Sequence, residues 1–127
     1  MNHIQSPRTD DAAIEQEIVA KGLTAPRVTP ADIEANIASE HYFTARNGAD
    51  HADAINSSAY ATSGAALGLL TFCVLVLRNG FTVTGESACA SPANFDAEIG
   101  RKIARANAVN KIWPLMGYAL KESLSKK

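Results

Sequence analysis

The sequence predicts an α+β fold, in which a small antiparallel β-sheet is packed by a long C-terminal helix and by helices from the N-terminal part of the chain. One reason is a β-hairpin over about 69–89, where two strand-like stretches flank Asn79-Gly80, a strong hairpin signal. Another is the apolar residue every three or four positions from Phe95 to Trp113, the period of a helix that packs one face on a sheet. The 127 residues are enough to bury one small core.

Two helices are expected ahead of the sheet. Thr9 or Asp10 can cap a helix that runs to about residue 21, where Gly22 is placed to end it. Thr29-Pro30 starts a second helix, because a capping hydroxyl precedes a proline at the first helical position. We expect this second helix to reach about residue 39.

The chain is divided at residue 28 into a tail with a short helix (1–28) and a single α+β domain (29–127). Within this domain, His41–Thr44 is predicted to be a short strand rich in aromatic residues. Residues at about 46–68 are predicted to form a long loop. Their many Asp, Asn and Ser side chains compete for backbone hydrogen bonds and weaken the helix preference of the alanines.

The register of the hairpin follows from its turn. If Asn79 and Gly80 form a two-residue turn, Arg78 pairs with Phe81. Cys73 then lies opposite Glu86, too far from Cys89 for a disulfide, and two free thiols fit a reducing compartment. This register gives one face with five large apolar side chains, which are Phe72, Val74, Val76, Phe81 and Val83.

The first strand of the hairpin, 69–77, is apolar on both faces, and a domain with few helices has difficulty covering both. An uncovered apolar face usually marks a partner subunit, so we expect a homo-oligomer.

The C-terminal helix is expected to end or kink near Trp113, because Pro114 lacks a backbone N–H and clashes with the preceding turn. Residues 115–124 then form a second helical piece. The stripe expected to face the sheet consists of Phe95, Ile99, Ile103, Ala106, Val109 and Ile112.

Charge is balanced overall but uneven along the chain. The net charge of −1 argues against a nucleic-acid partner. Residues 1–66 carry nine acids and four bases, a net −5, whereas 67–127 carry four acids and eight bases, a net +4. An anionic ligand therefore belongs to the C-terminal half. No signal peptide is visible and the longest apolar run, 67–77, is too short to span a bilayer, so we expect no membrane association and a cytoplasmic protein.

The candidate ligand-binding residues lie in that basic half. Arg101 and Arg105 are one helical turn apart, and together with Asn94 near the helix start they could hold phosphate oxygens. The alternative is a solvated helix face in which Arg101 and Lys102 pair with Glu98, and on spacing alone this is the commoner outcome. Phe81 could stack on a nucleobase, although such a residue is more often part of a core.

The sequence gives no case for an enzyme. Ser87 and Cys89 are the nucleophile candidates of the hairpin, and no histidine lies near them in sequence. The three histidines and two cysteines do not have metal-ligand spacing, so no metal site is expected. Phosphate-loop and dinucleotide glycine patterns are absent, and no cofactor is expected.

The stretch from Asn79 to Tyr118 resembles a family of small proteins from tailed phages and prophages, and the resemblance extends over about 69–124. The matching features are Asn79-Gly80-Phe81, Gly85, Ser87-Ala88-Cys89, Pro92, Asn94-Phe95, Glu98, Gly100, Lys111, Trp113 and Gly117-Tyr118.

That family looks similar to the anti-Thoeris sponge proteins of phages. The resemblance implies an anti-defence protein that binds cyclic ADP-ribose isomers, and also cyclic oligonucleotides, without cleaving them. It further implies dimers or hexamers with ligand pockets between protomers, acting in the host cytoplasm. Under this hypothesis the ligand-binding residues are Phe81, Asn94, Arg101 and Arg105. The loop at 46–68 has no counterpart in the resemblance.

A second hypothesis is a non-enzymatic phage accessory protein. It would bind a host protein through the apolar strand face or through the long loop, and the basic helix would only pack and solubilise.

Overall fold

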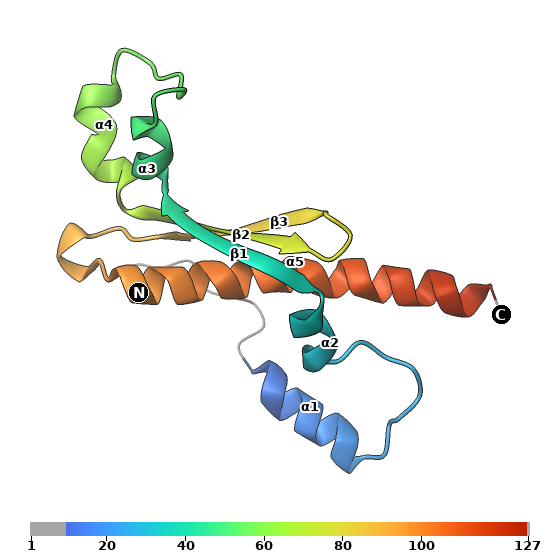
Figure 1. Cartoon of the computed structure of the whole chain (residues 1–127). Coiled ribbons are helices and arrows are strands. Elements are labelled where there is room, and N and C mark those ends of the chain that lie inside the picture. The colour runs from blue at the N-terminus through green and yellow to red at the C-terminus, as the bar shows by residue number, and fades with distance from the viewer. Residues whose placement is uncertain (1–9, 127) are drawn as a thin grey trace.

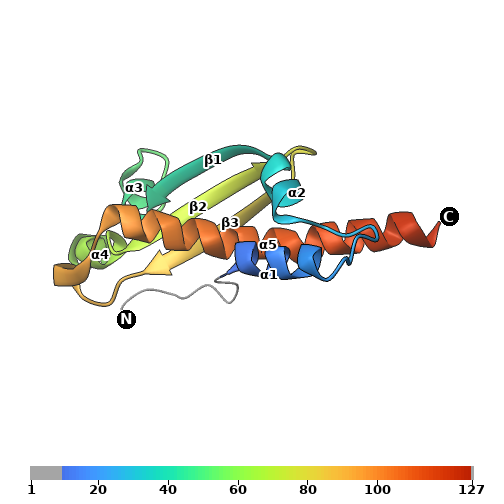
Figure 2. The ribbon, with the colours of Figure 1, turned by 90° about the horizontal axis from the view of Figure 1, so that it is seen from below.

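The computed structural model describes residues 10–126 and shows the expected α+β architecture. Three antiparallel strands lie in the order β1-β2-β3, and the long helix α5 crosses one face of the sheet (Figures 1 and 2). The elements are α1 (Asp11–Ala20), α2 (Pro30–Ala35), β1 (Ile37–Thr44), α3 (Ala45–Asp50), α4 (Tyr60–Leu67), β2 (Leu70–Leu77), β3 (Thr82–Ala88), the 3-10 helix η1 (Pro92–Asn94) and α5 (Ala97–Ser125).

Small residues bring α5 against the sheet. The buried positions of α5 are Gly100, Ala104, Ala108 and Ile112, spaced by four residues. On β3, a Cβ added to Gly85 would lie 2.1 Å from the carbonyl oxygen of Ala104 and 2.3 Å from the amide nitrogen of Ala108. Of the expected stripe, Ile112 is buried as predicted, whereas Ile99 is 47% exposed and the other buried positions of α5 are small residues.

The hairpin register differs by one residue from the predicted one. Leu77 N–H donates to the carbonyl of Phe81 (2.8 Å), so the loop has three residues, with Gly80 at φ +89°. Cys73 consequently pairs with Gly85 instead of Glu86. A one-residue slip exchanges the faces of one strand relative to the other. Val83 thus lies on the α5 side with Cys73 and Leu75, and both cysteines are free thiols, as expected.

The helix α5 runs through Pro114 as one element of 29 residues, so the expected end near Trp113 was wrong. Pro114 removes one backbone hydrogen bond from the helix. The helical segments before and after it are each several turns long and remain joined in one helix. The start of α5 also differs from the prediction. Asp96 caps α5 by accepting from the amide of Ile99 (3.0 Å), while Ser91-Pro92, ahead of it in the sequence, begins η1.

Residues 46–68 are not a structureless loop. The side chains and amides of Thr44 and Asn47 form a reciprocal capping box (2.9 and 3.1 Å) that starts α3 directly after β1. The alanine-rich segment after it folds as α4. These two helices stand together at one end of the sheet, on the side away from α5 (Figure 1), and residues 45–67 are called the arm below.

The N-terminal helices follow their predicted starts. Asp10 caps α1, and Thr29 caps α2 with Pro30 at its first position. The strand β1 begins at Ile37, four residues before its predicted start, so α2 is shorter than expected. The expectations for the tail and for a cap at Thr9 lie outside the described residues. No helix in the described range is long and apolar enough to cross a membrane.

The face of the sheet opposite α5 is called the open face. In the described part of the chain only the base of the arm meets it (Figures 1 and 2). Its central strand presents half-buried apolar side chains, and Phe43 of β1 contacts Phe72 there, with ring centroids 6.0 Å apart. The open face consists of Ser39, His41, Phe43, Phe72, Val74, Val76, Thr82, Thr84 and Glu86.

Replacing Gly85 with alanine should destabilise the fold strongly. The new methyl group would overlap backbone atoms of α5, which cannot move aside as a flexible side chain can. We expect a loss of about 1–3 kcal/mol or more in the free energy of unfolding, measured by chemical denaturation. The matched control is Gly117→Ala in α5, where nothing lies within 4 Å. It should stabilise the helix by about 0.5–1 kcal/mol. Equal effects of the two substitutions would contradict this account of the α5 contact.

Candidate ligand site

A hollow of about 120 Å³ lies where the end of β1, the start of α3 and the first turns of α5 meet. The hairpin brings α5 back along the sheet, and the capping box after β1 turns the chain upward into the arm, so the two helix starts are held near each other. The lining is Tyr42, Phe43, Thr44, Asn47, Thr71, Phe95, Ala97 and Arg101.

Arg101 is the cationic side chain of this hollow. It is exposed, and within residues 10–126 its guanidinium forms no hydrogen bond or ion pair. Tyr42, Phe43 and Phe95 are among the residues that line the same hollow; Tyr42 lies on the α5 side of β1, whereas the ring of Phe43 lies on the open face against Phe72. A free guanidinium beside aromatic faces can bind a phosphate by forked hydrogen bonds while a base stacks on a ring.

A second, wider hollow of about 530 Å³ adjoins the first and shares Phe43 and Asn47 with it. Its other lining residues come from the arm and are Gly48, His51, Asp53 and Ala54. The Asn47 side-chain oxygen is used by the amide of Thr44 (2.9 Å), which leaves the Asn47 NH₂ group available to a ligand. The two hollows together offer an aromatic wall, a cation and amide donors.

Arg105 is engaged within the protein. Its guanidinium donates two hydrogen bonds to Glu34 of α2 (2.8 and 3.1 Å) and two to Glu40 of β1 (2.9 and 3.1 Å). The Tyr42 hydroxyl donates to the same Glu40 carboxylate (2.7 Å). Arg105 thus joins α5 to α2 and β1, and in this arrangement it has little capacity left for a phosphate.

The network shifts the pKa of Glu40, Arg105 and Tyr42. The bonds from Arg105 and Tyr42 hold the pKa of Glu40 below its ordinary value, and the two carboxylates raise the pKa of Arg105. Burial and the bond to Glu40 raise the pKa of Tyr42. Burial also raises the pKa of the Cys73 thiol, which favours its neutral form.

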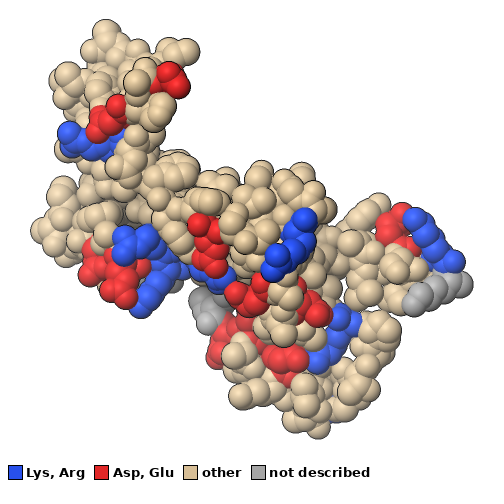
Figure 3. Space-filling view, viewed as in Figure 1, with Lys and Arg blue, Asp and Glu red and all other residues tan. Residues whose placement is uncertain are grey.

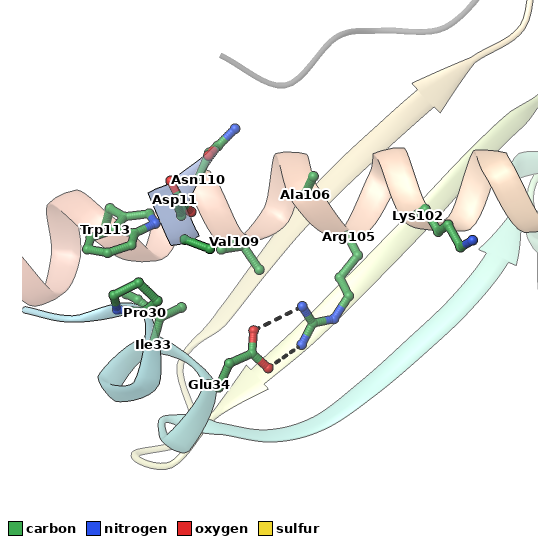
Figure 4. A pocket seen from close by; sticks show the side chains of 11 residues that line it. Asp11, Pro30, Ile33, Glu34, Lys102, Arg105, Ala106, Val109, Asn110 and Trp113 are labelled. Carbon is green, nitrogen blue, oxygen red and sulfur yellow. Dashed lines mark hydrogen bonds and ion pairs between the residues drawn. The ribbon is translucent and has the colours of Figure 1, made fainter. Parts of the chain in front are cut away.

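Another hollow, of about 390 Å³, lies beside Arg105 between α1, α2 and α5 (Figure 4). Its floor is apolar, formed by Ile33, Val109 and Trp113, and the Arg105–Glu34 pair closes one end. Lys102 at its rim pairs with Glu98 (3.3 Å), as the solvated-face interpretation of this helix expected. Basic and acidic side chains are interspersed over the face shown in Figure 3 and form no continuous positive surface.

The other two predicted residues lie apart from Arg101. Phe81, 55% exposed, is at the hairpin turn and lines a hollow of about 290 Å³ with Leu115 and Met116 of α5. Asn94 is exposed in η1, before the start of α5. Phe81 and Asn94 thus belong to opposite ends of the sheet. The four residues do not form one site in a single copy of the chain.

Sequence reasoning missed Phe43, Asn47 and Phe95 as site residues. The aromatic strand at His41–Thr44 was noted, but its position beside Arg101 depends on the pairing of β1 with β2. The Thr44–Asn47 spacing is a capping signal that could have indicated a helix start there.

The nucleophile candidates of the hairpin are inaccessible. Ser87 is 1% exposed and Cys89 4% exposed, and the Cys89 thiol donates to the carbonyl of Ser91 (3.2 Å). Among residues 10–126, no group of three or more His, Cys, Asp or Glu side chains could hold a metal ion.

The model of a family described as phage protein (N4 Gp49/phage Sf6 gene 66) matches residues 28–124. The match begins after α1 and takes in the sheet, the arm and nearly all of α5. No curated protein and no solved structure matches the chain.

Replacing Arg105 with glutamine should destabilise the protein. Glu34 and Glu40 would lose their charge-assisted hydrogen bonds while remaining close to each other. We expect a loss of about 1–3 kcal/mol in the free energy of unfolding. The matched control is Lys102→Gln, because the Lys102 side chain is 73% exposed and pairs only with Glu98 across one helical turn. It should change stability by less than about 0.5 kcal/mol. A loss no greater for Arg105→Gln than for this control would refute the stabilising role of the network.

Stability should also depend on pH through Glu40. Because the pKa of Glu40 is lower in the folded chain than its ordinary 4.5, the carboxylate stabilises the fold above pH 4.5, and this contribution is lost as the pH falls through the folded pKa. We expect Glu40→Gln to lose less stability than the wild type on acidification below pH 4.5, measured by denaturation at each pH. Some dependence of stability on pH should persist in this variant, since Arg27 also lowers the pKa of Glu15. If the stability of the wild type and of Glu40→Gln changes identically with pH, Glu40 does not contribute to the pH dependence.

Proposed function

The chain belongs to the phage protein family named for N4 Gp49 and phage Sf6 gene 66, and from this premise we propose that it is an anti-defence protein. It binds a cyclic nucleotide signal of host immunity, such as a cyclic ADP-ribose isomer, and sequesters it in the host cytoplasm without cleaving it. The observation that supports this function best is the free guanidinium of Arg101 in a hollow lined by aromatic side chains.

The chemistry of the hollow suits a nucleotide. Arg101 holds a phosphate oxygen pair, because a guanidinium presents parallel N–H donors at the spacing of a phosphate. Phe95 provides a ring face for a base beside Arg101, Phe43 provides one toward the wider hollow, and the Asn47 amide can donate to a ribose or base oxygen. The assignment thus keeps Arg101 from the expected set and replaces Phe81 and Asn94 by Phe43, Phe95 and Asn47.

Size favours binding over both adjoining hollows. Pockets for small organic ligands usually measure about 300–1,000 Å³, so the hollow of about 120 Å³ holds one moiety of a nucleotide. The wider hollow on the other side of Phe43 accommodates the remainder. Arg105 acts as a positioning residue in this proposal, since it holds Glu40 and through it the hydroxyl of Tyr42, which lines the first hollow.

Sequestration without turnover agrees with the placement of the reactive groups. Ser87 and Cys89 are buried away from solvent and do not line either hollow. The groups that line the first hollow are hydroxyls, an amide, a guanidinium and aromatic rings. The wider hollow adds the imidazole of His51 and the carboxylate of Asp53, but its lining contains no Ser, Thr or Cys that this pair could activate.

The proposal is tested by a thermal-shift screen of the purified chain against cyclic ADP-ribose isomers and cyclic di- and trinucleotides. A ligand that binds only the folded state adds about 2.7 kcal/mol of stability at 100 times its dissociation constant. We expect a selective increase in Tm, with the ligand recovered intact after denaturation. No shift with any of these compounds would overturn the proposal, and recovery of a cleaved ligand would replace sequestration by turnover.

Within this proposal, Arg101→Ala should weaken binding of the ligand that the screen identifies. The loss of one charge-assisted phosphate contact corresponds to about 1.5–3 kcal/mol, or about 10- to 100-fold in Kd. Isothermal titration calorimetry would measure this change. Lys102→Ala is the control, because the neighbouring residue is also an exposed base on α5 but lines a different hollow. Equal affinities of the Arg101 and Lys102 variants would remove Arg101 from the site.

A further inference from the structure

We propose that the hollow of about 390 Å³ beside Arg105 is a second ligand site, which takes an organic cation with an apolar body, such as an arylalkyl amine. The ammonium group lies at the end formed by Asp11 and Trp113, and the apolar body lies on Ile33 and Val109. This hollow shares no lining residue with the two hollows of the proposed nucleotide site. The inference therefore goes beyond that function and does not depend on it.

The hollow has the size and lining of a pocket for a small organic molecule. Such pockets usually measure about 300–1,000 Å³ and combine mostly apolar walls with a few polar groups. Here three helices, α1, α2 and α5, supply the walls (Figure 4). The apolar part of the lining consists of Ala12, Pro30, Ile33, Ala106, Val109 and Trp113.

The two bases that line the hollow already have carboxylate partners. Arg105 donates two hydrogen bonds to Glu34 and two to Glu40. Lys102 pairs with Glu98 (3.3 Å). An anionic ligand would have to displace one of these carboxylates from its base. A cation meets no such competition, because a carboxylate accepts up to about four hydrogen bonds and each oxygen of Glu34 receives one from Arg105.

The end of the hollow remote from Lys102 is acidic. Asp11 and Trp113 lie at this end, whereas the two lining bases lie toward the other (Figure 4). Asp11 belongs to the first turn of α1, and the carboxylate of Asp10 caps the same turn. The positive end of a helix dipole corresponds to about half an elementary charge, so these two carboxylates outweigh it. The local field therefore favours a cation.

Trp113 adds an attraction that depends on the charge of the ligand. The face of an indole ring is the best aromatic partner for an ammonium group, and the contact strengthens where water is partly excluded. Trp113 is half-buried beside the apolar floor of the hollow. It is the one tryptophan of the sequence, so tryptophan fluorescence reports on this hollow directly.

The site also depends on α1, which the family model does not cover. The helix contributes Asp11 and Ala12 to the lining. Two hydrogen bonds from Arg27 to Glu15 (2.5 and 2.9 Å) hold α1 to the chain that follows it. A ligand that contacts α1 and α5 together stabilises α1 in its closed position, because the ligand binds only that state.

The first experiment titrates the whole chain, at constant ionic strength, with three probes of similar size: phenethylamine as the cation, phenethyl alcohol as the neutral compound and phenylacetate as the anion. Trp113 fluorescence measures binding. We expect a saturable change with phenethylamine at a Kd of about 1–10 mM, as for a fragment of about ten non-hydrogen atoms. The other two probes should bind at least about fivefold more weakly. No saturable change with phenethylamine would overturn the proposal, as would equal or tighter binding of either other probe.

A substitution that fills the hollow locates the site. Ala106→Phe adds a ring to the lining from α5 and should weaken phenethylamine binding at least about tenfold, with an unchanged circular dichroism spectrum. The matched control is Ala119→Phe, on the same helix but in the lining of a different hollow, which should bind as the wild type does. If folded Ala106→Phe keeps the affinity of the wild type, phenethylamine does not bind in this hollow.

Asp11→Asn tests the charge and decides the outcome if Ala106→Phe does not fold. We expect about a threefold or greater loss of affinity for phenethylamine and a smaller loss for phenethyl alcohol. The control is Glu17→Gln, which removes the same charge from α1 at a side chain that is 65% exposed and does not line the hollow. Equal affinity of the two variants for phenethylamine would overturn the placement of the ammonium group at Asp11.

Hydrogen exchange tests the part played by α1. If phenethylamine binds only while α1 is closed, the amide protons of α1 should exchange about threefold more slowly at twice the Kd. Arg101→Ala should bind phenethylamine as the wild type does, so the outcome of the nucleotide screen does not affect this site. Exchange in α1 that phenethylamine leaves unchanged at saturation would show that α1 is not a wall of the site.

Discussion

The contact between β3 and α5 at Gly85 sets the geometry of the whole molecule. With no side chain at this position, the backbone of the helix approaches the sheet so closely that the alanines 104 and 108 fill the remaining space. Because the helix lies this near, it covers one face of the sheet along its length, and Ile33 of α2 packs into the same core beside it. The arm and the open face are therefore on the other side, and the starts of α3 and α5 meet only at the end of β1 (Figures 1 and 2).

The Arg105 network determines which basic residue of α5 remains available. Two arginines one turn apart look equivalent in the sequence, yet one reaches the carboxylates of α2 and β1 while the other points to an aromatic hollow. The difference arises from strand pairing, which brings Glu40 beside α5, and from the short α2, which presents Glu34 to the same guanidinium. The two arginines of one helix face are thus separated into one that joins elements of the fold and one that the proposed function can use.

Much of the fold was predictable because its signals are local: the capped helix starts at Asp10 and Thr29, the hairpin around Gly80 and the period of α5. The features that sequence reasoning missed depend on distant contacts. Glycine and alanine carry no hydrophobic signal, so the sheet-facing stripe of α5 was assigned to larger residues. The three-residue turn shifts the pairing of β2 with β3 by one residue from the predicted register. Of the residues that line the hollow beside Arg101, only Arg101 was among the candidates from the sequence, since the aromatic residues there come from β1 and from the η1–α5 junction.

The helix α1 has a consequence for local stability. It buries none of its side chains, lies outside the family match, and is tied back chiefly by the Arg27–Glu15 ion pair and a few contacts with α2. Its opening exposes almost no apolar surface, so the free energy of this local unfolding is a small part of that of the sheet and α5. The chain consequently contains a cooperative core and an N-terminal helix that exchanges its amide protons on its own timescale.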